Sequence, residues 1–145
     1  MRLHFTLLAK PALATLLAIG LATGCSWVET TPESNSDFQE RLPADPDKAR
    51  SKKNALDFRA WVSAHGTPPQ REAATHVQRI IGEWDAQTGR AYISTDINGG
   101  IKPVEDSMAA AMALAAAFDH WKTSKQSSVS VYDVMGNALI ANYEF

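Results

Sequence analysis

Apolar residues recur at helical spacing in the stretch that begins near Asn54. The positions that form this pattern are Ala55, Phe58 and Val62, with Leu56 and Trp61 beside them. Such spacing puts apolar side chains on one face of a helix, and a glycine such as Gly66 commonly ends one. The pattern predicts a helix from about Asn54 to His65, with His65 placed to complement its carboxyl end.

A second helix is predicted directly after the first. Thr67-Pro68-Pro69-Gln70 has the pattern of a capping box, with Thr67 at the N-cap, proline in the first turn and Gln70 reaching back. From there the helix is expected to run to about Gly82 or Glu83. Its predicted core positions are Ala73, Val77, Ile80 and Ile81.

The remaining chain predicts strand, helix, strand and strand. Residues 91–97 alternate as a half-buried strand that Asn98-Gly99-Gly100 ends, and residues 129–134 and 138–144 form a hairpin across Met135-Gly136-Asn137. A helix is expected between, from about Val104 to Thr123. Its predicted core positions are Met108, Ala111, Met112, Ala115, Phe118 and Trp121. The order predicts an α+β domain over residues 54–145, with a three-stranded antiparallel sheet packed against about three helices in two layers.

The first 24 residues have the pattern of a signal peptide. Arg2 and Lys10 supply positive charge, and residues 11–24 carry none. Spanning a bilayer takes about 20 apolar residues, and this stretch is shorter. The sequence therefore predicts an exported protein whose signal peptide covers residues 1–24.

Leu21-Ala22-Thr23-Gly24-Cys25 resembles the lipobox of bacterial lipoproteins, in which a small residue precedes a lipidated cysteine. The match departs from the family at Ala22, where leucine is preferred. The resemblance implies cleavage before Cys25, a diacylglycerol on that residue, and an extracytoplasmic protein anchored in the cell membrane through its acyl chains. An ordinary secretory signal followed by a free cysteine is the alternative.

Composition after the signal peptide excludes one class of partner. Residues 25–53 contain three prolines and few large apolar residues, and they predict a lipidated N-terminus followed by a flexible linker.

Without Arg2 and Lys10 the chain has 12 basic residues against 16 acidic ones, a net charge of −4. This balance lacks the basic footprint of a nucleic-acid-binding protein. We expect no nucleic-acid partner.

The sequence positions of the histidines indicate neither a metal site nor a catalytic pair. His65, His76 and His120 do not stand at metal-ligand spacing from one another or from Cys25, so no metal or other cofactor is expected. Asp119 and His120 are adjacent on a predicted helix and point about 100° apart, which favours a solvated face over a joint site. His76 is expected at a helix edge.

Other catalytic patterns are absent from the sequence. The serines near Ser127 lie in a predicted loop, outside any Gly-x-Ser-x-Gly elbow, and residues 98–102 lack the spacing of a phosphate-binding loop. Asp96, Glu105 and Asp106 could gather around a cation, but they lack the spacing of a calcium loop. Carboxylates before a helix are explained more simply as favourable charges at its N-terminus. We predict no catalytic residue.

Several short runs of the domain also resemble small actinobacterial lipoproteins of unknown function. These runs are Phe58-Arg59-Ala60-Trp61-Val62, His65-Gly66-Thr67, His76-Val77, Phe118-Asp119-His120-Trp121-Lys122 and Val131-Tyr132-Asp133. The resemblance implies a cell-envelope context and assigns no activity and no site residue.

Two hypotheses of function follow from these patterns. The first is a non-catalytic module that binds an envelope protein or polymer, and the second is a small exported hydrolase that uses His76 or His120 with a carboxylate. A cleft that holds a histidine and an acid within hydrogen-bond reach favours the enzyme, whereas a flat exposed aromatic patch favours binding.

Overall fold

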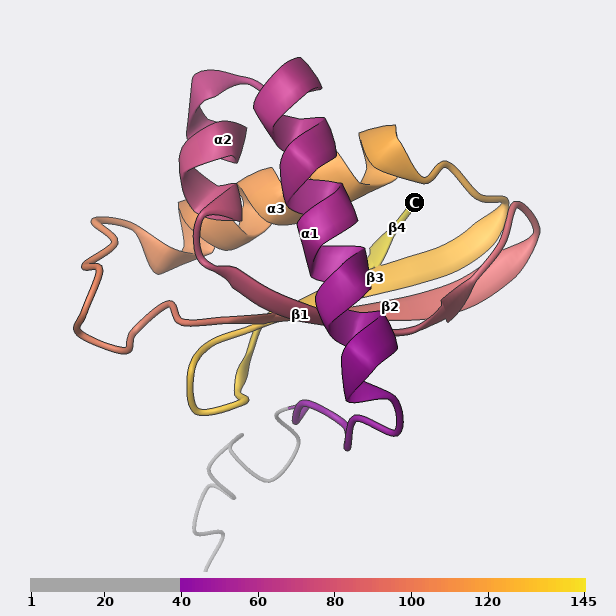
Figure 1. The fold of residues 1–145 in the computed structure, drawn as a ribbon, viewed down its shortest axis with the longest axis horizontal. Coiled ribbons are helices and arrows are strands. Elements are labelled where there is room, and N and C mark those ends of the chain that lie inside the picture. Colours follow the sequence, from indigo (N-terminus) through magenta and orange to yellow (C-terminus); the bar gives the residue numbers. More distant parts are fainter. Residues whose placement is uncertain (1–39) are drawn as a thin grey trace, which may run out of the picture. The chain divides into compact units, whose positions relative to one another are not determined.

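A computed structural model describes residues 40–145 of the chain, and the predicted signal peptide, Cys25 and residues 25–39 of the predicted linker lie outside this range. The elements are α1 (Lys48–His65), α2 (Pro68–Ala74), β1 (Val77–Trp84), β2 (Thr88–Thr95), α3 (Ser107–Trp121), β3 (Gln126–Tyr132) and β4 (Ala138–Glu144). The predicted α+β class is confirmed, and the three helices cover one face of the sheet (Figure 1).

The sheet differs from the predicted one in strand number and direction. Its order is β1-β2-β3-β4, with antiparallel β1–β2 and β3–β4 hairpins and a parallel pairing between β2 and β3. A parallel pair needs a crossover connection, and α3 provides it. The three-stranded antiparallel sheet expected from the sequence is therefore corrected to a four-stranded mixed sheet.

The missing strand is β1, which the sequence pattern assigned to the second helix. Helix α2 ends at Ala74, and residues 77–84 are extended. The pairing with β2 shifts register between Val77 and Arg79, which is a β-bulge. Because of the extra residue, Val77 and Ile80 both point into the core on the helix side of the sheet. These two buried residues are three positions apart in the sequence, which is the spacing expected on one face of a helix. Ile81 is buried too, on the other face.

The start of α2 follows the sequence prediction. Thr67 Oγ1 accepts a hydrogen bond from the Gln70 amide at 3.4 Å, and Gln70 Oε1 accepts one from the Thr67 amide at 2.9 Å. This is the capping box, with proline in the first helical positions. The prediction of the helix start is confirmed, and only its length is wrong.

The buried faces of the long helices agree with the sequence in part. Ala55, Phe58 and Val62 of α1 are buried as predicted, although α1 begins at Lys48, before the expected Asn54. In α3 the buried stripe consists of Ala111, Leu114, Ala115, Ala117 and Phe118. Met108 and Met112, predicted as core, are 52% and 44% exposed. Both lie beside this stripe, and Met108 is in the first turn of the helix.

Aromatic rings connect the helices to the sheet. The Phe118 ring lies 5.8 Å from Phe58 of α1, 5.2 Å from Trp84 of β1, 5.5 Å from Trp121 and 4.8 Å from Phe145, between ring centroids. Edge-to-face and tilted pairs at these distances add to the free energy of burial. Phe118 is therefore the common contact of four parts of the chain.

The segment 40–47 crosses the sheet face opposite the helices. Glu40 accepts a backbone hydrogen bond from Ala138 at 3.0 Å, and its carboxylate accepts from Tyr132 Oη, from Ser130 Oγ at 3.1 Å and from Asn142 Nδ2 at 3.3 Å. Burial and the Glu40 carboxylate raise the pKa of Tyr132 above its ordinary value. These contacts hold the segment against β3 and β4.

Asp45 fixes the other end of the same segment. Its carboxylate accepts hydrogen bonds from Ser51 Oγ at 2.6 Å and Arg79 Nη1 at 3.1 Å, and its side chain is 5% exposed. The Ser51 hydroxyl, aided by the Asp47 amide and Arg79, holds the pKa of Asp45 below its ordinary 3.8. Asp45 thus joins the segment to α1 and β1.

Asp45→Asn should destabilise the fold in a pH-dependent way. At neutral pH we expect a loss of about 1–3 kcal/mol in the free energy of unfolding, because Ser51 and Arg79 lose a charged acceptor. A carboxyl with a lowered folded-state pKa stabilises the protein above its ordinary 3.8, and this contribution disappears as the pH falls below that value. Urea unfolding should show the difference from wild type shrinking below about pH 4.

Asp57→Asn is the matched control, since the Asp57 side chain is 49% exposed and pairs only with Lys53 among the described residues. Its effect should stay within about 0.5 kcal/mol. A difference for Asp45→Asn that is the same at acid and neutral pH would contradict the assignment.

Candidate functional site

The β1–β2 pairing brings together a histidine and an aspartate that are distant in the sequence. His76 lies in the turn before β1, and Asp96 directly follows β2. Val77 pairs with Thr95 in the antiparallel ladder, so the flanking residues meet as well. The Asp96 amide donates to the His76 carbonyl at 3.0 Å. The backbone therefore sets the two side chains at one corner of the sheet.

The two side chains form a short, mostly buried hydrogen bond. His76 Nδ1 lies 2.6 Å from Asp96 Oδ1, and the two side chains are 7% and 25% exposed. Gln78 Nε2 donates to the other Asp96 oxygen at 3.3 Å. Because a carboxylate only accepts hydrogen bonds, the imidazole proton lies on Nδ1. The second ring nitrogen, Nε2, then carries a lone pair in the neutral ring.

His76 borders a groove of about 490 Å³ between α2 and the start of α3. The groove is lined by Pro69, Glu72, Ala73, His76, Pro103, Val104, Glu105, Asp106, Ala109, Ala110 and Ala113. Within residues 40–145 no fully buried side-chain nitrogen or oxygen lacks a hydrogen-bond partner. Nε2 makes no hydrogen bond among these residues, so it is not fully buried, and the groove is the cavity that His76 lines.

The groove has an apolar lining of small side chains, called the alanine floor below, together with negatively charged side chains. Alanine and proline side chains form most of the wall, and Glu72, Glu105 and Asp106 carry the charge. Asp106 also caps α3, accepting from the Ala109 amide at 2.9 Å, which confirms for this one residue the predicted role of the carboxylates before the helix. Asp96 does not join Glu105 and Asp106 at the groove wall, because it pairs with His76.

This arrangement can accept a proton or a hydrogen bond at Nε2. A buried carboxylate that holds a histidine through Nδ1 is also the orienting half of a general base. The residues that line the groove, however, include no hydroxyl, thiol, lysine or arginine. An oxyanion formed there would develop among carboxylates, without a positive group to stabilise it. The chemistry therefore suits a bound hydrogen-bond donor better than an acyl-transfer reaction.

The other histidines behave differently. His120 is exposed in the last turn of α3, and no carboxylate among residues 40–145 lies within hydrogen-bond distance of it. His65 caps the end of α1 as predicted, with Nδ1 2.9 Å from the Trp61 carbonyl. The expectation that His76 lies at a helix edge is wrong, because α2 ends before it. Recognising β1 as a strand would have revealed that His76 and Asp96 face each other across a hairpin.

Two negative findings concern only the part of the chain from residue 40 onward. It holds no cluster of three or more His, Cys, Asp or Glu side chains arranged to bind a metal ion. None of its helices has the length and apolar character needed to cross a membrane.

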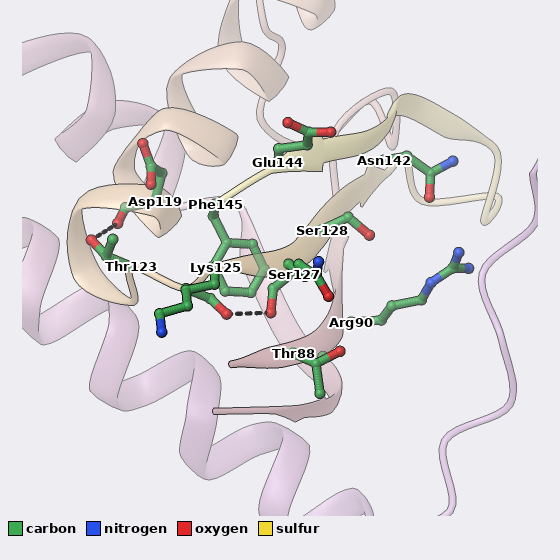
Figure 2. A pocket seen from close by; sticks show the side chains of 13 residues that line it. Thr88, Arg90, Asp119, Thr123, Lys125, Ser127, Ser128, Asn142, Glu144 and Phe145 are labelled. Carbon is green, nitrogen blue, oxygen red and sulfur yellow. Dashed lines mark hydrogen bonds between the residues drawn. The ribbon is translucent and has the colours of Figure 1, made fainter. Parts of the chain in front are cut away.

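A larger pocket of about 730 Å³ lies where β2 and β3 begin and β4 ends. Figure 2 shows the Phe145 ring near its centre, with Arg90, Asp119, Lys125 and Glu144 spread around it and their charged ends directed apart. Hydroxyl groups at its wall bond within the protein, such as Ser127 Oγ to Ser124 Oγ at 2.6 Å. The pocket is polar, but its charged groups do not converge on one point.

Comparison with protein-family models, curated proteins and solved structures found no match to this chain. The lipobox resemblance rests on residues outside the described range, so lipidation of Cys25 stays a prediction. The geometry around His76 is therefore the main structural guide to function.

The tautomer of His76 tests this geometry directly. In the neutral imidazole we expect the proton on Nδ1, because Asp96 accepts it, and long-range ¹H–¹⁵N spectra distinguish the two ring nitrogens. In Asp96→Asn the amide group can donate to Nδ1, so the proton should move to Nε2. His120 is the internal control and should keep the same spectrum in both proteins. A native His76 protonated at Nε2 would contradict the pairing.

Proposed function

We propose that the chain is an exported lipoprotein, anchored in the cell membrane through Cys25, whose folded domain is a non-catalytic binding module of the cell envelope. The signal-peptide pattern and the lipobox at residues 21–25 support export and membrane anchoring. The groove between α2 and α3 is the proposed binding site.

The observation that carries the binding site is the state of His76. Its side chain is more than nine-tenths buried, Asp96 holds it in place, and Nε2 is still open to the groove. Preorganised polar groups beside an apolar surface are typical of ligand sites. A ligand that donates a hydrogen bond to Nε2 completes the pairing of the imidazole.

The charges of the groove indicate the class of ligand. Glu72 and Glu105 are exposed carboxylates that make no hydrogen bond with their side chains among the described residues, and the groove wall holds no cation. A positive group gains favourable electrostatic energy there, and a short aliphatic chain fits the alanine floor. We therefore propose an ammonium-bearing chain, such as a lysine side chain of an envelope protein or a peptide amine of an envelope polymer.

The small exported hydrolase remains the second candidate, because the His76–Asp96 pair fulfils the expected histidine and acid within hydrogen-bond reach. His120 is not part of this alternative, since it is exposed and no carboxylate of the described chain lies within hydrogen-bond distance of its ring. Water would have to be the nucleophile, activated by Nε2. The carboxylates at the groove oppose the negative charge of such a transition state.

A lysine probe distinguishes the two candidates. We expect Nα-acetyl-lysine methylamide to bind purified mature protein with a dissociation constant on the order of 1 mM, about −4 kcal/mol, and to shift the amide resonances that surround the groove. The same probe acetylated at Nε should bind more weakly, because it has lost its charge. Glu72→Gln should weaken binding of the charged probe.

Glu144→Gln removes an exposed carboxylate at the other pocket and should leave the affinity unchanged. Equal binding of the charged and neutral probes would contradict the proposed ligand class. Hydrolysis of p-nitrophenyl acetate that falls more than about tenfold in both His76→Gln and Asp96→Asn would instead support the hydrolase.

Cys25→Ser tests the anchor. The variant keeps the signal peptide but cannot form the thioether, so we expect it to leave the membrane fraction and appear in the soluble extracytoplasmic fraction. Fractionation with a salt wash, followed by immunoblotting, measures this. A variant that stays with the membrane after the wash would show that the anchor is assigned to the wrong residue.

A further inference from the structure

Three exposed apolar side chains lie in two adjoining loops at one end of the domain. Ile101 is 89% exposed in the loop 96–106, and Val134 and Met135 are 47% and 69% exposed in the turn 133–137 between β3 and β4. Large apolar side chains in such positions carry a cost in water unless something covers them. We call these three residues the apolar tips.

The two loops that carry the apolar tips are packed together. The Val134 amide donates to the Ile97 carbonyl at 2.9 Å, and Asn98 Nδ2 donates to Asp133 Oδ2 at 3.5 Å. Gly99 also lies beside Val134, since a Cβ atom added at Gly99 would be in van der Waals contact with Val134 Cγ2, at 3.5 Å. The loops that carry the three tips are therefore neighbours in the folded domain.

The described chain begins beside one of these loops. The Leu42 amide donates to the Gly136 carbonyl at 2.9 Å, and Arg41 Nη2 donates to the Met135 carbonyl at 3.3 Å. Figure 1 shows the described chain beginning close to this turn. The 15 residue steps from Cys25 to Glu40 reach at most about 50 Å when fully extended. A lipid at Cys25 would keep Glu40 within that distance of the bilayer, and the β3–β4 turn that carries Val134 and Met135 lies beside the first described residues.

The cations closest to the apolar tips in the sequence favour a lipid surface, whereas the exposed carboxylates of the loop 96–106, Glu105 and Asp106, line the groove beside α2. The Asp133 carboxylate is turned inward, accepting from the Met135 amide at 2.9 Å and the Asn137 amide at 3.0 Å, and Glu40 is bound to Tyr132. Lys102, next to Ile101, and Arg41 are both exposed cations. Apolar side chains flanked by cations are typical of segments that enter the headgroup region of anionic membranes.

We propose that the apolar tips insert into the headgroup region of the membrane that holds the lipid anchor, so that the domain docks on the bilayer in one orientation. This inference rests on the proposed lipidation of Cys25. The anchor raises the local concentration of the bilayer, which makes a small apolar contact sufficient.

Labelling single cysteines tests the docking on the full lipidated chain. Cys25 is the only native cysteine and its thiol is consumed by the lipid, so Ile101→Cys or Met135→Cys adds one reactive thiol. Each variant is labelled with an environment-sensitive fluorophore and reconstituted in vesicles of phosphatidylethanolamine and phosphatidylglycerol, with or without nitroxide-labelled acyl chains. We expect a blue-shifted emission and quenching by the nitroxide lipid at both positions.

Leu56→Cys is the matched control, because Leu56 is an apolar residue, 62% exposed, on α1. Its fluorophore should be neither shifted nor quenched. Val134→Glu, which adds a charge at an exposed position, should reduce the quenching at residue 101.

Each remaining outcome overturns the docking. If the chain floats with the vesicles but the fluorophores at residues 101 and 135 are not quenched, the docking is contradicted. The proposed lipid anchor would still hold in that case. A blue shift without lipid quenching indicates a protein partner or a second copy at the tips. A chain that does not float with the vesicles contradicts the anchor, and with it the docking that rests on it.

Discussion

The β-bulge at the start of β1 is the constraint on which the rest of the structure depends. It adds one residue between Val77 and Arg79 while β2 continues without one. As a result Val77 and Ile80 both enter the core, and the strand end brings His76 opposite Asp96. Bulges commonly redirect side chains beside functional sites. A regular strand would turn one of the two apolar residues to the other face.

The groove depends on the crossover between the two hairpins. Because β2 and β3 are parallel, the chain must return over the helix-side face, and α3 does so while packing against α2. The capping residue Asp106 fixes where α3 begins, and small alanines in its first turns leave space beside α2. The same connection carries Ile101 to the end of the domain that meets the β3–β4 turn. The candidate binding site and one of the apolar tips, Ile101, thus belong to the same connection.

The sequence predicted the elements whose signals are local. The capping box, the α1 stripe and the β3–β4 hairpin each depend on residues a few positions apart, and the structure contains all three. Strand β1 was missed because the bulge and the burial of both faces remove the alternation that marks a strand. The pairing of His76 with Asp96 depends on that strand, so it was hidden as well. The parallel β2–β3 pairing carries no local signal of its own.

A purely structural role explains the His76–Asp96 pair poorly. The hydrogen bond from the Asp96 amide to the His76 carbonyl already holds together the start of β1 and the end of β2. Removing a carboxylate and an imidazole from water costs free energy that their mutual attraction only partly offsets, and apolar residues of similar size commonly stabilise a fold at least as well. A structural role also gives no reason for the second ring nitrogen to lie beside a groove. Under the proposed function, an oriented Nε2 beside an acidic, alanine-lined wall is a group kept to meet a ligand, and binding of the ligand offsets its cost to folding.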